Sequence, residues 1–276
     1  MLASTKAKIL AHKKQARKKQ KKAPQWLFPH SFEREYNKIL QSLVTLLNLS
    51  IKAILLPEIP SMIHEVSNKT PVRTDDFLDR LSGLIFYLRR SMQEKVESTI
   101  KGAEGIGIAI ARYNRKQLAK INESMFGIDL FLDEPYLEDQ LKLFSKQNAD
   151  LITDIVDHEL DQVAEVVERG LQEGSRFTTV ATEISKTFGI DARRARTIAR
   201  DQTAKLNASL TRLRQEEIGV EEYVWKSSND ERVRPTHRAN AGKTFRWDTP
   251  PPITGHPGHD VNCRCIASPV LDKLLQ

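Results

Sequence analysis

The residues best suited to chemistry gather near the end of this 276-residue chain, between Tyr223 and Cys265. The stretch holds both cysteines of the chain and three of its seven histidines. Thiolate sulfur and imidazole nitrogen are the ligands that zinc prefers in structural sites. The rest of the stretch is rich in proline, glycine and arginine, so its aliphatic core is small and a bound metal ion is one way to hold it together. The candidate metal ligands are His237, His256, His259, Cys263 and Cys265.

The spacing of these residues favours one set of four ligands. Cys263 and Cys265 are one residue apart, and they reach a common ion only if the backbone bends between them. A proline–glycine turn brings His256 back toward the cysteines, whereas His259 competes for the same position. With His237 from the preceding loop, these side chains would form a closed, tetrahedral Zn²⁺ site of the structural type. The predicted ligands are His237, His256, Cys263 and Cys265.

A second interpretation needs no metal. Cys263 and Cys265 would then be ordinary, partly buried thiols, and the histidines would make hydrogen bonds. A disulfide between the two cysteines is disfavoured, because a bridge across a single residue is strained. The cysteine count therefore indicates a reducing compartment rather than a disulfide framework.

The sequence predicts no catalytic residues. It contains no G-x-S-x-G, H-E-x-x-H or P-loop motif. A Cys–His nucleophile lacks an orienting third group nearby. Asp230, Glu231 and His237 could form a metal-assisted hydrolytic set, but they fit equally well as turn residues and a structural ligand. A zinc-supported nuclease that acts on nucleic acid is thus the enzymatic alternative.

The positive charge of the chain belongs to its N-terminal arm. Nine of the 43 Lys and Arg residues precede the first acid, Glu33, so the remaining 34 nearly balance the 36 Asp and Glu residues. Such an arm stays solvated and binds polyanions by counterion release, without sequence preference. The alternative is a solubilising tail. The residues expected to contact double-stranded DNA are Lys13, Lys14, Arg17, Lys18, Lys19, Lys21 and Lys22.

The apolar segments do not predict a membrane protein. The strongest of them, Leu43 to Leu56, is interrupted by Thr45, Asn48 and Lys52, and no apolar run approaches the roughly 18 residues of a membrane span. The N-terminal cations are not followed by an uninterrupted apolar block, so no secretory signal is expected.

Helical periodicity covers most of the chain, and a change of pattern follows Gly219. Six amphipathic segments are expected, with breaks at the glycines between them, and a strand with a hairpin partner comes after them. The expected fold class is α+β, mostly α: a long helical body with a small, β-containing C-terminal cap stabilised by zinc. The helical segments are Glu33–Ile54, Phe77–Val96, Gly107–Met125, Ile152–Leu171, Val180–Phe188 and Asp191–Ile218, and the strands are Tyr223–Trp225 and Thr244–Trp247.

Three arginines share one face of the last predicted helix. Arg193, Arg196 and Arg200 recur at steps of three and four residues. Such a stripe is either the solvated face of a packed helix or a contact for phosphate or for an acidic partner helix.

Several short motifs stand in the C-terminal part of the chain: Trp225, Asp230-x-Arg232-x-Arg234-x-x-His237, Gly242-Lys243-x-Phe245, Pro251-Pro252, His256-Pro257-Gly258 and Asn262-Cys263-Arg264-Cys265. Together they resemble the phage head morphogenesis domain of Mu F-like minor head proteins. The resemblance covers roughly Asp150 to Pro269 and includes a helix with Arg200-Asp201-Gln202, where the family usually has Arg-Thr-Glu. Some members have cysteine at the positions of Arg234 and His237, so the arginine at 234 removes one potential metal ligand.

The resemblance implies a structural protein of a tailed phage or prophage with no catalytic residues to carry over. Its expected partners are the portal protein, capsid or scaffold proteins and packaged DNA, and its expected place is the virion or procapsid interior, with host cytoplasm during assembly. Because related phage proteins sometimes carry toxin-like transferase domains, such a transferase is a further alternative. The expected division of the chain is a basic arm (1–23), an N-terminal helical region (24–148) and a Mu F-like domain (149–276).

Overall fold

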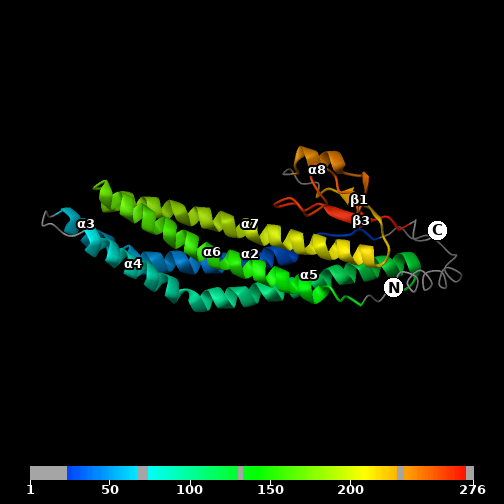
Figure 1. Ribbon diagram of the computed structural model, residues 1–276, viewed down its shortest axis with the longest axis horizontal. Helices are drawn as coiled ribbons and strands as arrows, with labels where there is room; N and C mark the ends of the chain where they lie inside the picture. The colour runs from blue at the N-terminus through cyan, green and yellow to red at the C-terminus, as the bar shows by residue number, and fades with distance from the viewer. Residues whose placement is uncertain (1–23, 68–73, 130–132, 229–232, 272–276) are drawn as a thin grey trace. The chain divides into compact units, whose positions relative to one another are not determined.

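The computed structural model describes residues 24–67, 74–129, 133–228 and 233–271. The described chain is mostly helical and has a three-stranded antiparallel sheet near its C-terminal end, which confirms the expected fold class (Figure 1). The arm, residues 1–23, lies outside the described ranges, and with it the predicted DNA contacts Lys13, Lys14, Arg17, Lys18, Lys19, Lys21 and Lys22.

Long helices dominate the described chain, and the strands are confined to the segment after Glu217. The elements are α2 (His30–Ser50), the π-helix η1 (Ile51–Leu55), α3 (Ile59–Ser67), α4 (Thr74–Ser91), α5 (Gln93–Phe126), α6 (Leu137–Gln172), α7 (Phe177–Glu217), β1 (Glu222–Lys226), α8 (Pro235–Asn240), β2 (Thr244–Arg246) and β3 (Ile266–Pro269).

By packing, the chain divides into two compact units, and each is described by itself. Both units are discontinuous in sequence, so the linear division expected at residue 149 stays a prediction. Unit 1 consists of Met1–Glu33, Gly105–Phe144 and Arg200–Gln276, and unit 2 consists of Arg34–Glu104 and Ser145–Ala199.

Unit 2 is held together by the apolar stripes that the sequence predicts. Leu40, Leu43 and Leu47 of α2 are fully buried, as is the stripe of α6 that begins at Ile152. Polar contacts fix the register: Gln41 donates a hydrogen bond to the carbonyl of Ala192 on α7 at 2.8 Å. By length and composition alone the helical stretch His30–Leu55 could cross a membrane; 33% of its most apolar window is buried inside the protein, including Leu40, Leu43 and Leu47, whereas Leu46 and Leu49 are exposed.

The expected breaks at glycines inside two helices are wrong. Helix α5 runs without interruption through Gly102, Gly105 and Gly107. A Cβ added at Gly107 would lie 2.8 Å from the ring of Phe144, so the glycine permits close packing in unit 1 rather than ending the helix. Helix α7 likewise passes through Gly189, where two separate helices are expected from the sequence. A glycine inside a helix costs only about 1 kcal/mol, which tertiary packing readily offsets.

The C-terminal part of unit 1 forms a small cap, defined here as residues 221–228 and 233–270. Its sheet has the order β2-β1-β3, and all pairs are antiparallel. The predicted strand and its pairing partner are confirmed as β1 and β2, whereas β3 is a strand that the sequence analysis did not predict. Tyr223, Trp225 and Trp247 pack with both cysteines and Ala267 to form the cap's core.

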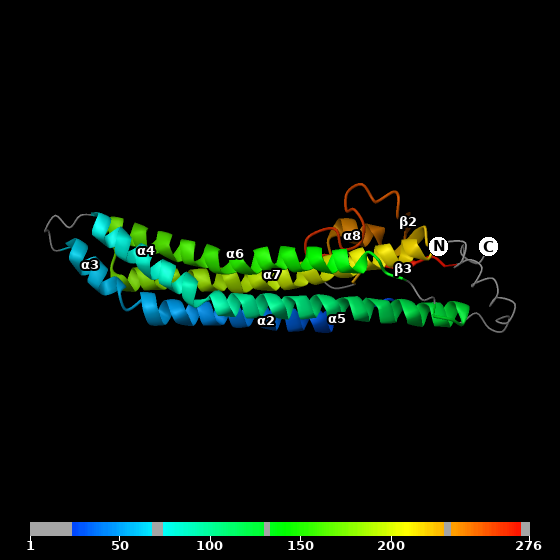
Figure 2. The same cartoon turned by 60° about the horizontal axis from the view of Figure 1, so that its bottom comes forward.

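The cap lies against the C-terminal half of α7 (Figures 1 and 2). The contact is close at Gly258, because a Cβ at this position would lie 2.3 Å from the Cβ of Ala208. The side chain of Gln215 on α7 donates to the carbonyl of Ala267 in β3 at 2.9 Å and accepts from the indole of Trp247 at 3.2 Å. Helix α7 is therefore the platform that positions the cap.

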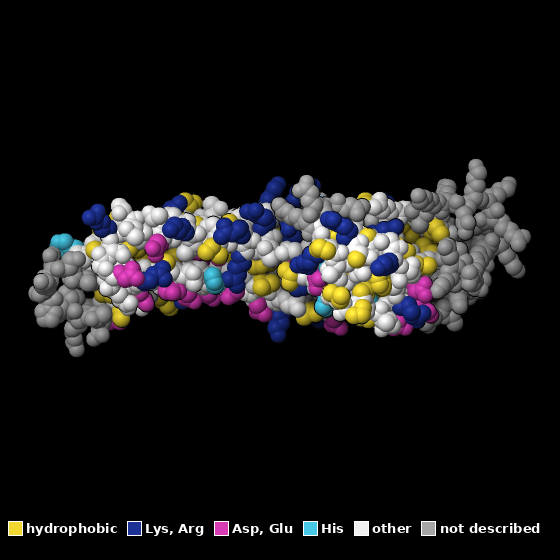
Figure 3. Space-filling model, turned by 90° about the horizontal axis from the view of Figure 1, so that it is seen from above, with side chains coloured by type: hydrophobic (Ala, Val, Ile, Leu, Met, Phe, Trp, Pro, Cys, Tyr) yellow, Lys and Arg dark blue, Asp and Glu magenta, His cyan; other side chains and the backbone are white. Residues whose placement is uncertain are grey.

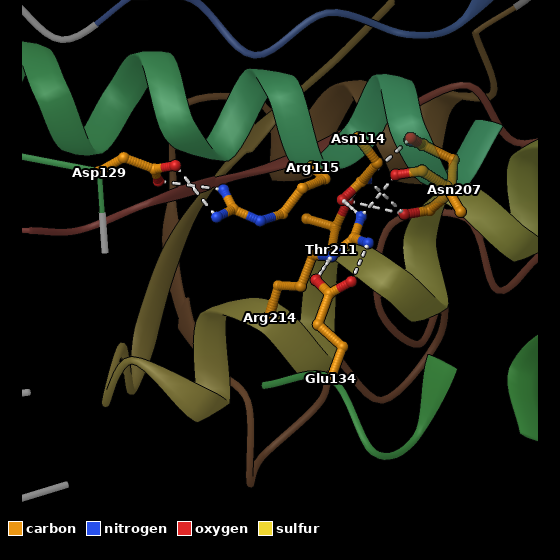
Figure 4. A network of polar contacts seen from close by, with 8 residues as sticks. Asn114, Arg115, Asp129, Glu134, Asn207, Thr211 and Arg214 are labelled. Carbon is orange, nitrogen blue, oxygen red and sulfur yellow. Dashed lines mark hydrogen bonds and ion pairs between the residues drawn. The ribbon is translucent and has the colours of Figure 1, made fainter. Parts of the chain in front are cut away.

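A buried ion pair holds this platform within unit 1 (Figure 4). The guanidinium of Arg214 is 1% exposed and donates to both carboxylate oxygens of Glu134 at 2.5 and 2.9 Å. It also donates to Asn114 of α5, whose amide in turn donates to Thr211 and Asn207 of α7. Loss of either charge would leave the other buried and uncompensated, which typically costs about 3–5 kcal/mol.

The close approach of the cap to α7 predicts different effects for alanine at two glycines. Gly258 and Gly242 both have positive φ (88° and 79°), so either replacement forces a side chain into the left-handed region at a cost of about 1–2 kcal/mol. Only Gly258→Ala adds a clash with α7, because nothing lies within 4 Å of a Cβ at Gly242. Overpacking of this kind typically costs about 1–3 kcal/mol more.

The measurement is urea unfolding followed by tryptophan fluorescence, since Trp225 and Trp247 lie in the cap. We expect Gly258→Ala to lower the free energy of unfolding by about 1–3 kcal/mol more than Gly242→Ala does. Equal losses in the two variants would show that the cap does not pack tightly on α7.

Candidate metal centre

The cap brings together three of the four predicted metal ligands. His237 comes from the short helix α8, which begins at Pro235, a residue whose fixed φ suits a first helical turn. Cys263 and Cys265 come from the segment immediately before β3. The turn into this segment is made at Asn262, which has a φ of 62° and is of the residue type that tolerates the left-handed conformation.

The three ligand atoms have a separation that suits one metal ion. Nδ1 of His237 lies 3.5 Å from Sγ of Cys263 and 3.6 Å from Sγ of Cys265. All three atoms lie within 4.8 Å of one another, and all three residues are buried. For Zn–S bonds of about 2.3 Å and Zn–N bonds of about 2.0 Å, tetrahedral geometry places neighbouring ligand atoms roughly 3.5–3.8 Å apart. This cluster, called the Cys₂His cluster below, could therefore hold a metal.

The proton on His237 is directed away from the sulfurs. Nε2 of His237 lies 2.8 Å from Oδ2 of Asp260, and an ionised carboxylate can only accept a hydrogen bond. In the neutral imidazole the proton therefore sits on Nε2, and Nδ1 presents its lone pair to Cys263 and Cys265. A carboxylate that orients a ligating histidine in this way is a common feature of zinc sites.

The two thiols of the cluster shift each other's pKa in opposite directions. The pKa of Cys263 is lowered to about 6, first because Cys265 donates a hydrogen bond to its sulfur and also because the backbone N–H of Gly258 points at it from 3.3 Å. The pKa of Cys265 is raised, since its proton is held against Cys263 and its sulfur is buried. Cys263 is therefore the thiol that loses its proton more readily, and metal binding would require both thiols to lose theirs.

His256, the fourth predicted ligand, lies outside the Cys₂His cluster. Its Nδ1 is 2.8 Å from the hydroxyl of Tyr223, and its ring packs 5.0 Å from that of Trp247. Burial raises the pKa of Tyr223, so its hydroxyl stays protonated and can donate a hydrogen bond to Nδ1 of His256. The competing candidate, His259, is exposed and is not part of the cluster.

A second layer of contacts around the cluster has no counterpart in the sequence analysis. Arg264, between the two cysteines, pairs with the carboxylate of Glu33. Arg200 of α7 pairs with the same carboxylate at 3.2 Å. Asp260 pairs with Arg234 at 3.3 Å as well as with His237. The sequence analysis singled out Arg200 in the basic stripe and Arg234 and Arg264 in the motifs, but no spacing in the sequence identifies Glu33 or Asp260 as their partners.

Variants of the histidines distinguish the ligand set of the structure from the four-residue set predicted from sequence. His237→Ala and Cys263→Ser should weaken zinc binding by more than about 100-fold, because each removes a ligand. Asp260→Asn should weaken it by about 10–100-fold through loss of orientation. His256→Ala is the matched control and should keep the affinity.

Equilibrium dialysis against zinc, with elemental analysis of the protein compartment, gives these affinities. A loss in His256→Ala as large as that in His237→Ala would contradict the assignment, and the sequence-based set would stand in its place.

Comparisons with known proteins agree with the motifs in this region. The family model described as phage Mu protein F like protein matches residues 161–268. A protein of Haemophilus influenzae, described as uncharacterized, is 36% identical over 189 residues, which are 65% of this chain and 42% of that protein. The chain thus spans about two fifths of the length of this relative. No solved structure matches the chain. Residues 161–268 thus match the model of the phage Mu protein F-like family, and over this segment the resemblance seen in the sequence is confirmed.

Proposed function

We propose that this protein is a minor head protein of a tailed phage or prophage, and that it acts in procapsid assembly at the portal vertex. The observation that carries this proposal is the family match over residues 161–268. The matched segment contains all of α7 and the whole Cys₂His cluster. The protein would work inside the procapsid and virion, after synthesis in the host cytoplasm.

Zinc is the metal that suits the cluster best. Two thiolates and one imidazole are soft and borderline ligands, a set that favours Zn²⁺ over Mg²⁺ or Ca²⁺. The cap has a core of only six buried residues, and two of them are the cysteines themselves. Zinc would therefore act mainly by holding the cap together, so its binding free energy would add to the stability of the cap.

An assembly role needs surfaces for other proteins, and the cap offers one. Ile253 and Val261 are 80% and 52% exposed. Figure 3 shows hydrophobic side chains gathered at the surface of the cap, with Lys and Arg among them. Apolar side chains that gather on an exposed surface often mark protein–protein contacts. Portal, capsid or scaffold proteins are the partners that this function implies.

The proposed contact with packaged DNA uses the basic arm. Two arginines of the stripe on α7 are further candidates for contact with phosphate: Arg193 and Arg196 are exposed and form no ion pair with the described residues. Arg194 and Arg200 pair with Asp154 and Glu33. Of the predicted basic stripe, Arg193 and Arg196 are thus the two residues without an ion-pair partner among the described residues.

Procapsid assembly tests the proposed function directly. Procapsids assembled from the portal, capsid and scaffold proteins of the same phage should incorporate the full chain in few copies, because the portal vertex is unique. Quantitative mass spectrometry of purified procapsids measures the copy number, and particles made without portal protein are the control.

Incorporation without portal would contradict the placement at the vertex. Absence from all particles would contradict the assembly role, and metal-dependent DNA cleavage lost in His237→Ala would favour the nuclease instead.

Salt dependence tests the DNA contact. Each phosphate neutralised contributes about −0.9 to the slope of log K against log salt concentration, so deleting residues 1–23 should reduce the magnitude of the slope by about 6. The double variant Arg193→Gln/Arg196→Gln should reduce it by about 2 at most. Fluorescence anisotropy with a random-sequence duplex gives both slopes. An unchanged slope and affinity after the deletion would show that the arm is not the contact.

A further inference from the structure

The Cys₂His cluster borders a pocket that its proposed structural role does not explain. The pocket has a volume of about 100 Å³, and all three cluster residues line it. A cavity needs roughly 10–15 Å³ of accessible volume to hold one water molecule, so this pocket has room for several waters or for a group the size of phosphate. An ion held by the cluster would therefore border an accessible space.

The protein offers no fourth ligand on this side among the described residues. A zinc ion with three protein ligands is the arrangement of open sites, in which water or another exogenous group occupies the fourth position. His256 is held by Tyr223, and His259 is exposed outside the cluster. Asp260 contacts the far nitrogen of His237 rather than the side that faces the sulfurs.

The charge of the lining residues favours an anion in this space. Of the residues that the structure describes, three carry a guanidinium group that lines the pocket, Arg200, Arg234 and Arg264, and none of the described lining residues carries a carboxylate; Asp230 and Glu231 lie outside the described ranges. Their ion-pair partners, Glu33 and Asp260, are not among the lining residues. Guanidinium groups bind oxyanions well because their N–H groups form a planar fork.

A buried amide in the same pocket also lacks a partner. The side-chain oxygen of Asn262 is buried without a hydrogen bond, although Asn262 lines the pocket. The backbone N–H of Asn262 is bound to Asp201 at 3.1 Å, so the residue is fixed in place. A buried polar group without a partner costs about 1–3 kcal/mol, and a ligand or a ligand-bound water would satisfy it. A 180° rotation of the side-chain amide of Asn262 exchanges the positions of its oxygen and its NH₂ group, so the NH₂ group can face an anion.

We propose that the metal centre is open and that its fourth position is taken by a small oxyanion held by Arg234 and its neighbours in the pocket. This inference rests on the proposed metal centre and goes beyond its structural role. The ligand class is an inorganic phosphate-sized oxyanion or a carboxylate group, and water fills the position in its absence. The centre then couples the stability of the cap to anion binding, since an anion that binds only the metal-loaded cap stabilises it by mass action.

Cobalt substitution tests whether the fourth position is open. The full chain is loaded with Co²⁺, whose visible absorption reports the geometry and the ligands of the ion. Titration with inorganic phosphate, and in a parallel series with acetate, should shift the bands saturably. Arg234→Gln should raise the half-saturating phosphate concentration at least fivefold; the side chain of Arg234 is 49% exposed, so the variant is expected to fold.

The matched control is Arg246→Gln, another exposed arginine of the cap that does not line the pocket. It should leave the phosphate response unchanged. A four-coordinate cobalt spectrum that no anion alters would mean that the protein supplies the fourth ligand; the open site would then be wrong, while the metal centre would stand. A response equally weakened in Arg234→Gln and Arg246→Gln would show a general charge effect and overturn the proposed anion pocket. Failure of the chain to bind cobalt would overturn both the open site and the metal centre.

Discussion

The contact of one imidazole with two thiols is the interaction on which the cap depends. His237 comes from a segment more than twenty residues before the one that holds Cys263 and Cys265. The cap has few buried aliphatic side chains that could hold these two segments together. The same contact places Arg264 opposite Glu33, so the cap's linkage to the start of α2 in unit 1 follows from the geometry of the C-x-C turn. Without a bound ion, only a few hydrogen bonds and the surrounding packing hold the cluster together, and these hydrogen bonds are weaker than metal–thiolate bonds.

Direct packing and hydrogen bonds join the cap to helix α7 within unit 1. Helix α7 carries the buried Arg214–Glu134 pair on one side and receives Gly258 of the cap on another. Gln215 joins the two, because its amide binds both β3 and Trp247.

Periodicity predicted the helical faces well, because burial of a stripe is a local property of the sequence. It failed at Gly107 and Gly189, where a glycine lies inside a continuous helix, because the packing that offsets its cost comes from other segments. Strand β3 was missed for a similar reason, since four residues ending in proline carry no strand signal by themselves. Rare cysteines and histidines made the cluster visible in the sequence. The diversion of His256 to Tyr223 and the pairing of Arg264 with Glu33 depend on tertiary contacts that no spacing rule contains.

X-ray absorption at the zinc edge of the purified full chain tests the central claim most directly, because it counts the atoms bound to the metal. The account predicts one zinc per chain, with two sulfur neighbours at about 2.3 Å and lighter neighbours at about 2.0–2.1 Å. One of these lighter neighbours would be the imidazole of His237, and another the exogenous ligand. A metal-free protein, or a zinc ion surrounded only by nitrogen and oxygen, would contradict it.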